Sequence, residues 1–264
     1  NGRRERIGDP VSASGGMGQR EAKYEALDND GLAMVGYRVK SGEVMVKKET
    51  PLDLTTTGIG MDRGPSEYRD SAVSYRIPDP AYIDKVMISQ TEKDTTVIKV
   101  QTRQTRRPEL GDKFSSRHGQ KGVCSQKWPA VDMPFSESGI QPDVIINPHA
   151  FPSRMTIGMF VESLAGKAGA LHGLAQDSTP FKFDEQNTAG DYFGHQLMKA
   201  GYSYHGNEPM YSGITGEELG ADIYVGVVYY QRLRHMVNDK YQVRTTGPVV
   251  PTTGQPIKGR KRGG

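Results

Sequence analysis

The sequence predicts an α+β protein that is rich in loops. In four stretches before residue 105, apolar and polar residues alternate with a period of two, which is typical of half-buried strands. Two stretches beyond residue 150 instead repeat apolar residues at spacings of three and four, as amphipathic helices do. The 32 glycines and 16 prolines among 264 residues favour many turns and short elements.

The first part of the chain is predicted to be mainly β-structure. Residues 1–30 are polar and rich in glycine and serine, so we expect a flexible or disordered loop there. Residues 31–105 contain the four alternating stretches, and Thr57–Pro80 between them has little periodicity, which predicts a long exposed loop. The predicted strands are Met34–Val39, Glu43–Lys47, Tyr82–Ser89 and Thr95–Thr102.

The second part, residues 106–264, is predicted to mix short strands with helices. Val123–Trp128 and Asp143–Ile146 are expected to form short strands. The strongly β-prone run Ala221–Tyr230 leads into residues 231–240, where we expect a helical turn.

Two helices are expected in this part. Pro152 and Ser153 form a helix start signal, and Ala189–Ala200 is a second amphipathic stretch that Gly201 would end. The core stripe expected for the first helix consists of Ile157, Phe160, Val161, Leu164, Ala168 and Leu171.

Arg154 would then lie at the first position of a helix, where the helix dipole disfavours a cation. Two explanations are open. Arg154 pairs with a nearby carboxylate, or it joins the N-terminal amide groups in holding an anion such as a phosphate.

Charge is distributed unevenly, although the net charge is only +3. Residues 101–127 contain seven Lys or Arg and two acids, and residues 231–264 contain eight and one. Residues 128–222 between these basic blocks contain twelve acids and four Lys or Arg. If the fold brings the blocks together, they form a surface that attracts nucleic-acid phosphates; otherwise they are two unrelated solvated faces.

The stretch Gly111–Gly122, GDKFSSRHGQKG, is suited to binding polyphosphate. Its glycines allow the backbone to approach a ligand closely. Its cationic or ionisable side chains are Lys113, Arg117, His118 and Lys121.

Several classes of protein are excluded by what the sequence lacks. No run of eighteen apolar residues occurs, which excludes a membrane-spanning helix. The single cysteine, Cys124, excludes an internal disulfide and indicates a reducing compartment, and no Cys/His group has zinc-ligand spacing. Gly166 and Lys167 do not complete a P-loop, because Ala168 follows them.

The chain also lacks a compact Asp-x-Asp-x-Asp array of the kind that would hold two divalent ions. Alone, it is expected to bind phosphates without cutting or joining them. Since it begins without Met and ends on loop chemistry, we expect it to be a fragment of a larger chain.

Four motifs resemble the second-largest subunit of multisubunit DNA-directed RNA polymerases, including the bacterial β subunit. They are GDKFSSRHGQKG at 111–122, DMPF at 132–135, GIQPDVIINPHAFPSRMTIG at 139–158 and YYQRLRHMVNDK at 229–240. Three further stretches, at 163–172, 226–230 and 242–248, are most similar to eukaryotic RNA polymerase I. The resemblance extends from about residue 25 to the end, and polymerases II and III are open alternatives.

This resemblance implies roles for particular residues. Lys113 and Lys121 match lysines that face the RNA 3′ end and the incoming nucleotide, and Arg154 matches an arginine near the NTP triphosphate. His235 matches a residue near the active centre and the RNA–DNA hybrid. Supporting nucleic-acid contacts are expected from Arg232 and Arg234, whereas Arg117 and His118 are expected to shape the loop.

The resemblance also implies a setting for the chain. Residues 31–105 would belong to the wall (flap), and residues 106–264 to the hybrid-binding region of the active centre. Mg²⁺ would be held mainly by the largest subunit, with none bound by this fragment alone, and the family's zinc site would lie outside it. Partners would be the largest and other polymerase subunits, template DNA, the RNA transcript and NTPs, in the nucleus and nucleolus and without a membrane.

Two other functional classes are compatible with the basic blocks. The first is a free-standing RNA-binding or ribosomal-type protein without catalysis. The second is an independent phosphotransferase, which the lack of a carboxylate cluster disfavours.

Overall fold

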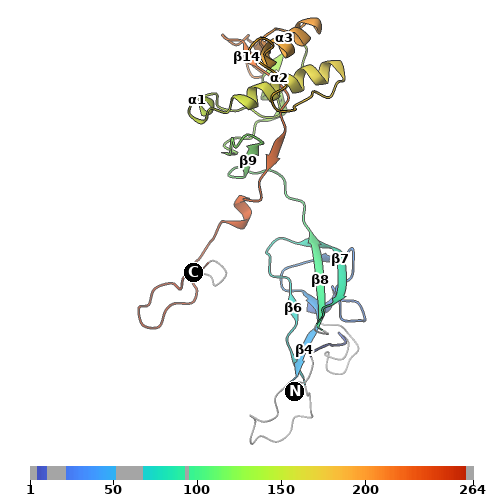
Figure 1. The fold of residues 1–264 in the computed structure, drawn as a ribbon. Coiled ribbons are helices and arrows are strands. Elements are labelled where there is room, and N and C mark those ends of the chain that lie inside the picture. Colours follow the sequence, from blue (N-terminus) through green and yellow to red (C-terminus); the bar gives the residue numbers. More distant parts are fainter. Residues whose placement is uncertain (1–4, 11–21, 52–67, 93–94, 260–264) are drawn as a thin grey trace, which may run out of the picture. The chain divides into compact units, whose positions relative to one another are not determined.

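A computed structural model describes residues 5–10, 22–51, 68–92 and 95–259 of the chain (Figure 1). The chain divides into two compact units, residues 1–107 and 108–264. This division falls close to the expected boundary between residues 105 and 106. Small antiparallel sheets occur in both units and helices α1 to α3 in the second, so the coarse α+β prediction is confirmed.

The first unit consists of small antiparallel sheets. One has the order β1-β4-β5, another the order β2-β7-β8, and β3 pairs with β6. The strands are β1 (Arg6–Ile7), β2 (Arg38–Val39), β3 (Val44–Val46), β4 (Lys48–Pro51), β5 (Tyr68–Asp70), β6 (Val73–Ser74), β7 (Ala81–Gln90) and β8 (Thr96–Arg103).

The two long predicted strands of this unit are confirmed as β7 and β8, and the two earlier ones form only the shorter β2 and β3. The predicted loop Thr57–Pro80 is wrong in its later half, because β5 and β6 lie within it; residues 57–67 lie outside the described residues. Both strands are short and pair with earlier strands, a long-range contact that periodicity cannot reveal.

Residues 22–30 contribute three buried side chains to the core of the first unit, which differs from the expected loop through residue 30. Tyr24 lies at the end of a short 3₁₀ helix, Ala22–Tyr24, and is buried together with Ala26 and Leu27. Burying one large apolar side chain stabilises a fold by about 1.5–3 kcal/mol, which outweighs the polar composition of the segment. Residues 1–4 and 11–21 of the expected loop lie outside the described residues.

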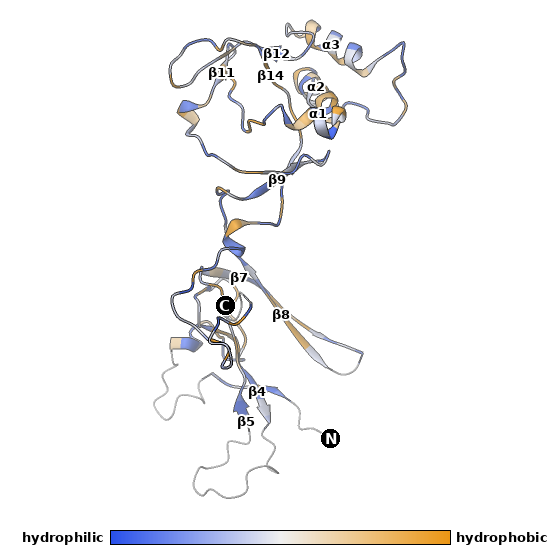
Figure 2. Cartoon of the chain, turned by 90° about the vertical axis from the view of Figure 1, so that its left-hand side faces the viewer, coloured by the Kyte–Doolittle hydropathy of each residue, from blue (hydrophilic) through white to orange (hydrophobic). Residues whose placement is uncertain are grey.

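The hairpin of β7 and β8 extends beyond this core as a two-stranded ribbon with apolar stretches (Figure 2). Val86 pairs with Val100 and Ile88 with Ile98, so these four residues share one face. Val86 and Val100 pack against the core cluster, whereas Ile88 is 61% exposed.

The second unit contains one three-stranded sheet, two strand pairs and three helices within its described residues. The three-stranded sheet has the order β10-β9-β15, and the pairs are β11 with β13 and β12 with β14. The strands are β9 (Lys113–Ser116), β10 (Gly122–Val123), β11 (Phe135–Ser136), β12 (Asn207–Glu208), β13 (Met210–Tyr211), β14 (Ile223–Tyr224) and β15 (Tyr230–Arg232). The helices are α1 (Ala150–Arg154), α2 (Ile157–His172) and α3 (Ala189–Lys199).

Helices α2 and α3 pack on each other around Ala168, Phe193 and Leu197, which are almost fully buried. The predicted stripe of the first helix is confirmed for Val161, Leu164 and Ala168, which lie in this cluster, while Phe160 is half-buried. It is wrong at the helix ends, where Ile157 is 63% and Leu171 40% exposed. The second helix is confirmed, and Gly201 follows it with a φ of 83°.

Two predicted strands in this unit are wrong. Only Val123 of the stretch Val123–Trp128 lies in a strand, and Asp143–Ile146 forms none, with Val144 and Ile145 exposed. The run Ala221–Tyr230 forms only β14 and the first residue of β15. A short apolar run does not form a strand unless another strand pairs with it.

Close backbone packing fixes the segment that leads into β15. A Cβ atom on Gly166 would lie 2.4 Å from the Val227 carbonyl oxygen, and one on Gly226 would lie 2.6 Å from the Ser163 oxygen. The Val227 N–H donates to that same Ser163 oxygen at 3.2 Å. The approach of α2 to residues 226–227 therefore depends on two glycines.

No helix in the described ranges is long and apolar enough to cross a membrane.

Candidate functional site

The stretch Gly111–Gly122 contains β9, the turn after it and the first residue of β10, so it forms most of a hairpin. Lys113 lies in β9, and Lys121 lies just before β10. Gly111 and Gly119 have φ values of 96° and 76°, which favour glycine, and Gly111 lies against Val237. The register pairs Val123 with Lys113. Both lysines thus lie on one short hairpin.

Strand β15 pairs with the other edge of β9, with Arg232 opposite Phe114. The Leu233 N–H donates to the Lys113 carbonyl oxygen at 2.8 Å. Residues of the two basic blocks, far apart in sequence, therefore meet in one sheet. The helical turn expected over residues 231–240 is wrong for Arg232, which is in the strand, and only Val237–Asp239 form a 3₁₀ turn.

The buried side chain of Asp112 connects the start of β9 to β15 and to the segment that follows β15. It accepts hydrogen bonds from the Val237 N–H at 3.0 Å and the Glu109 N–H at 3.1 Å, and from Arg232 Nη2 at 2.6 Å. These bonds hold the pKa of Asp112 below its usual value, although burial opposes the shift. Arg232 is thus engaged by a carboxylate of the fold.

Arg117 and His118 attach the hairpin turn to α2 through Glu162. Arg117 Nη2 lies 2.5 Å from one Glu162 oxygen, and His118 Nε2 contacts the other. The Tyr229 N–H donates to the same carboxylate at 3.2 Å. Burial acts to raise the pKa of Glu162, but hydrogen bonds from Arg117, His118 and Tyr229 outweigh it, so the pKa lies below its usual value. These contacts agree with the loop-shaping role expected for Arg117 and His118.

Arg154 is the last residue of α1, so the prediction that it begins a helix is wrong. Pro152 lies inside α1, and Met155 ends the helix in the left-handed conformation, with a φ of 52°. Thr156 then precedes α2 as its N-cap residue. A cation at the carboxyl end of a helix is favoured by the dipole, so the charge is well placed.

Gln120 links Arg154 to the lysine loop. Its side-chain oxygen accepts a hydrogen bond from Arg154 Nη1 at 3.3 Å, and its amide nitrogen donates to the Ala150 carbonyl oxygen at 3.4 Å and to the Thr156 hydroxyl. Gln120 is 4% exposed and directly precedes Lys121. Arg154 is therefore next to the loop.

The predicted site residues divide into two groups by their partners. Arg232 is held by Asp112, and Arg154 contacts Gln120. Within the described part of the chain, no side-chain hydrogen bond or ion pair is formed by the other four, Lys113, Lys121, Arg234 and His235. Lys121, Arg234 and His235 are exposed, and Lys113 is half-buried.

Sequence reasoning missed Asp112, Gln120 and Glu162. A signal existed for two of them. Asp112 is the only acid of the loop 111–122, and Glu162 is the only charged residue between residues 155 and 166. Each lone carboxylate pairs with cations of the site, whereas nothing in the sequence distinguishes Gln120.

The described residues contain no group of three or more His, Cys, Asp or Glu side chains that could hold a metal ion.

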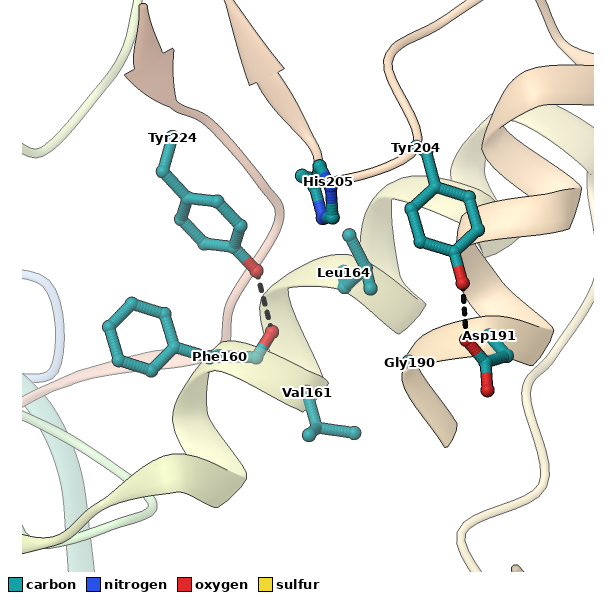
Figure 3. A pocket seen from close by; sticks show the side chains of 8 residues that line it. All are labelled: Phe160, Val161, Leu164, Gly190, Asp191, Tyr204, His205 and Tyr224. Carbon is teal, nitrogen blue, oxygen red and sulfur yellow. Dashed lines mark hydrogen bonds between the residues drawn. The ribbon is translucent and has the colours of Figure 1, made fainter. Parts of the chain in front are cut away.

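A hollow of about 340 Å³ lies between α2, α3 and β14 (Figure 3). The Tyr224 hydroxyl donates to the Phe160 carbonyl oxygen at 2.7 Å, and the Tyr204 hydroxyl bonds to Asp191. Burial raises the pKa of Tyr224 to about 12. None of the predicted site residues lines it; its lining is Phe160, Val161, Leu164, Gly190, Asp191, Tyr204, His205 and Tyr224.

Comparisons with known proteins agree with the resemblance of the motifs. The chain is 68% identical to DNA-directed RNA polymerase I subunit RPA2 of Neurospora crassa over 249 residues, which cover 93% of this chain and 20% of that protein. The chain is 57% identical to the probable polymerase I subunit RPA2 of Schizosaccharomyces pombe, over 98% of this chain and 22% of that protein. Identity to the polymerase III subunit RPC2 of the same yeast is 47%, over 100% of the chain and 22% of that protein.

The chain thus spans about a fifth of the length of these relatives. It is more similar to the polymerase I subunit than to the polymerase III subunit of the same organism. A family model described as RNA polymerase Rpb2, domain 6, matches residues 1–262. The chain therefore belongs to the RNA polymerase Rpb2 family, as a partial second-largest subunit most similar to that of RNA polymerase I.

Proposed function

We propose that this chain is the part of an RNA polymerase I second-largest subunit that binds the reacting phosphates during rRNA synthesis. Lys113 and Lys121 contact the RNA 3′ end and the incoming NTP, and Arg154 contacts its triphosphate. His235 and Arg234 contact the RNA–DNA hybrid. Arg232 supports them from β15, with its guanidinium paired to Asp112.

One observation carries this proposal. Four side chains on or beside one small sheet have no side-chain partner among the described residues: Lys113, Lys121, Arg234 and His235. Three neighbouring side chains, by contrast, have carboxylate partners: Arg117, His118 and Arg232. Cations that the fold does not neutralise keep their charge for a phosphate ligand. The paired ones hold the sheet and its turn in place.

The chemistry fits nucleotide addition. A polymerase must bind any of four nucleotides, so contacts to phosphate rather than to base edges suit it. Fixed cations that face the triphosphate stabilise the charge that develops during phosphoryl transfer. Removing one donor of this type costs about 3–4 kcal/mol, or on the order of a hundred- to a thousandfold in rate.

The rest of the proposal follows from the family. The whole protein is a subunit of a nucleotidyltransferase, with the largest subunit, other subunits, template DNA and the RNA transcript as partners, in the nucleus and nucleolus. Mg²⁺, held mainly by the largest subunit, supplies Lewis-acid activation of the reacting oxygens. Residues 31–105 form part of the wall (flap), and residues 106–264 part of the hybrid-binding region.

Replacing Lys121 by alanine in the assembled polymerase tests the role of the loop. We expect Lys121→Ala to lower kcat/KM for NTP by on the order of a hundredfold, because an unpaired charge facing the substrate is lost. Single-nucleotide addition measured over a range of NTP concentrations gives both constants.

Lys182→Ala is the matched control, because Lys182 is an exposed lysine whose ion pair among the described residues is with Asp177. It should leave both constants unchanged. Equal rates for Lys121→Ala and the wild type, at low and at saturating NTP, would contradict the proposed role of Lys121.

A further inference from the structure

Gln120 is a buried amide between the two cationic elements of the site. It belongs to the hairpin turn by sequence, yet its side-chain hydrogen bonds among the described residues go to α1 and to the residue that precedes α2. They reach Arg154, Ala150 and Thr156, thirty or more residues further along the chain. Gln120 thus connects the loop of Lys121 to the helix end that carries Arg154.

The partners fix which way the amide points. The Ala150 carbonyl oxygen can only accept a hydrogen bond, so it must face the amide nitrogen. The Arg154 guanidinium can only donate, so it must face the amide oxygen. A carboxylate would have no donor for Ala150, and an ammonium would have no acceptor for Arg154. The amide of glutamine both donates to Ala150 and accepts from Arg154, and its side chain is long enough to reach them.

We propose that Gln120 is a positioning residue that holds the Arg154 guanidinium beside Lys121, so that both cations meet the same triphosphate. This inference rests on the function proposed above. Arg154 is exposed and ends a helix of only five residues, so its side chain has little else to orient it. A long side chain loses rotamer freedom when it binds a ligand, and a buried acceptor reduces that loss by restricting it beforehand.

The test uses Gln120→Met, Arg154→Ala and the double variant in the assembled polymerase. Methionine is similar in length and fills the same space, but it makes none of the three hydrogen bonds. We expect Gln120→Met to raise the KM for NTP by about ten- to a hundredfold, in the same direction as Arg154→Ala, since misplacing a positioned group by about 1 Å can cost on the order of a hundredfold.

The double variant separates positioning from general damage. If Gln120 acts through Arg154, adding Gln120→Met to Arg154→Ala changes the KM for NTP no further. If the two effects multiply, Gln120 does not act through Arg154 and the proposal is overturned. Failure of Gln120→Met to assemble would show that Gln120 supports the fold itself, which also overturns it.

Arg154→Ala alone distinguishes this inference from the function on which it rests. If that variant leaves the NTP constants unchanged, the proposed role of Arg154 is wrong. If it raises KM while Gln120→Met behaves as the wild type, only the positioning role of Gln120 is wrong.

Discussion

At the scale of single residues, two carboxylates decide which cations are available to a ligand. Glu162 engages Arg117 and His118, and Asp112 engages Arg232. Each acid uses its cations to hold one segment to another, Glu162 the turn to α2 and Asp112 the strand β9 to β15. Among the described site residues, the cations left without a side-chain partner are therefore Lys113 and Lys121 in the hairpin and Arg234 after β15.

Protonation of Glu162 should release the hairpin turn from α2. Its pKa in the folded chain lies below the usual value of about 4.3, so its stabilising contribution is complete above that value and is lost as the pH falls through the lower, folded one. Because Arg117 is 57% exposed, we expect that contribution to be about 1 kcal/mol or less.

Hydrogen exchange of residues 111–122 in wild type and Glu162→Gln measures this effect. At pH 7 the variant should exchange severalfold faster. At a pH well below 4 the two should agree, because both side chains are then neutral. A difference that persists at low pH would mean that glutamine disturbs packing rather than charge.

At the scale of elements, α2 holds residues 226–227 in place through close backbone contacts. Those residues run into β15, and β15 completes the sheet of the lysine loop. Lys167 strengthens the same side of the helix, since its buried ammonium lies 2.6 Å from Glu208 and donates to the Gly206 carbonyl oxygen. The position of β15 thus depends on how closely α2 approaches.

Gly166→Ala tests this dependence. Alanine favours a helix by about 1 kcal/mol over glycine, so the substitution should stabilise α2 unless its methyl group collides. The Cβ would lie 2.4 Å from the Val227 carbonyl oxygen, and we therefore expect net destabilisation of about 1–3 kcal/mol. Thermal unfolding measures it, and exchange at residues 227–232 shows whether β15 loosens.

Gly190→Ala in α3 is the control for helix propensity. Its Cβ would lie 3.9 Å from the nearest atom, an ordinary contact, so this variant should be as stable as the wild type or slightly more so. If both variants are stabilised, α2 does not need the close approach.

The length of each helix or strand, and the residues at its ends, determined whether it was predictable from the sequence. β7 and β8 were predictable because their alternation is long, and α3 because it is amphipathic and Gly201 follows it. The start of the helix at Pro152 was wrong because Pro152 and Ser153 lie inside the separate short helix α1, which Met155 divides from α2. A left-handed residue other than glycine leaves no mark in periodicity.

The candidate site was predictable in its cations but not in their partners. The glycine-rich loop indicated Lys113, Arg117, His118 and Lys121 alike, and only the family resemblance singled out the two lysines. Asp112 and Glu162 act through pairs 120 and about 45 residues apart in sequence, and such pairing is a property of the tertiary fold. The hydrogen bonds of Gln120 have the same origin.

At the scale of the whole molecule, we expect the candidate site to supply positive charge and a partner subunit to hold the metal. Asp112, within the lysine loop, and Glu162, which contacts that loop, already pair with cations of the fold. An acid that balances an arginine is poorly suited to hold a divalent ion as well, because the arginine repels that ion. We therefore expect the metal ligands to come from the largest subunit.

A comparison of the full-length second-largest subunit with the assembled polymerase tests this expectation. The subunit alone should show no Mg²⁺-dependent nucleotidyl transfer, and the assembled enzyme should lose its activity when Mg²⁺ is chelated. Activity of the subunit by itself would indicate an independent phosphotransferase. If the subunit instead failed to co-purify with a largest subunit that carries a metal-binding aspartate cluster, its cations would serve RNA binding without catalysis.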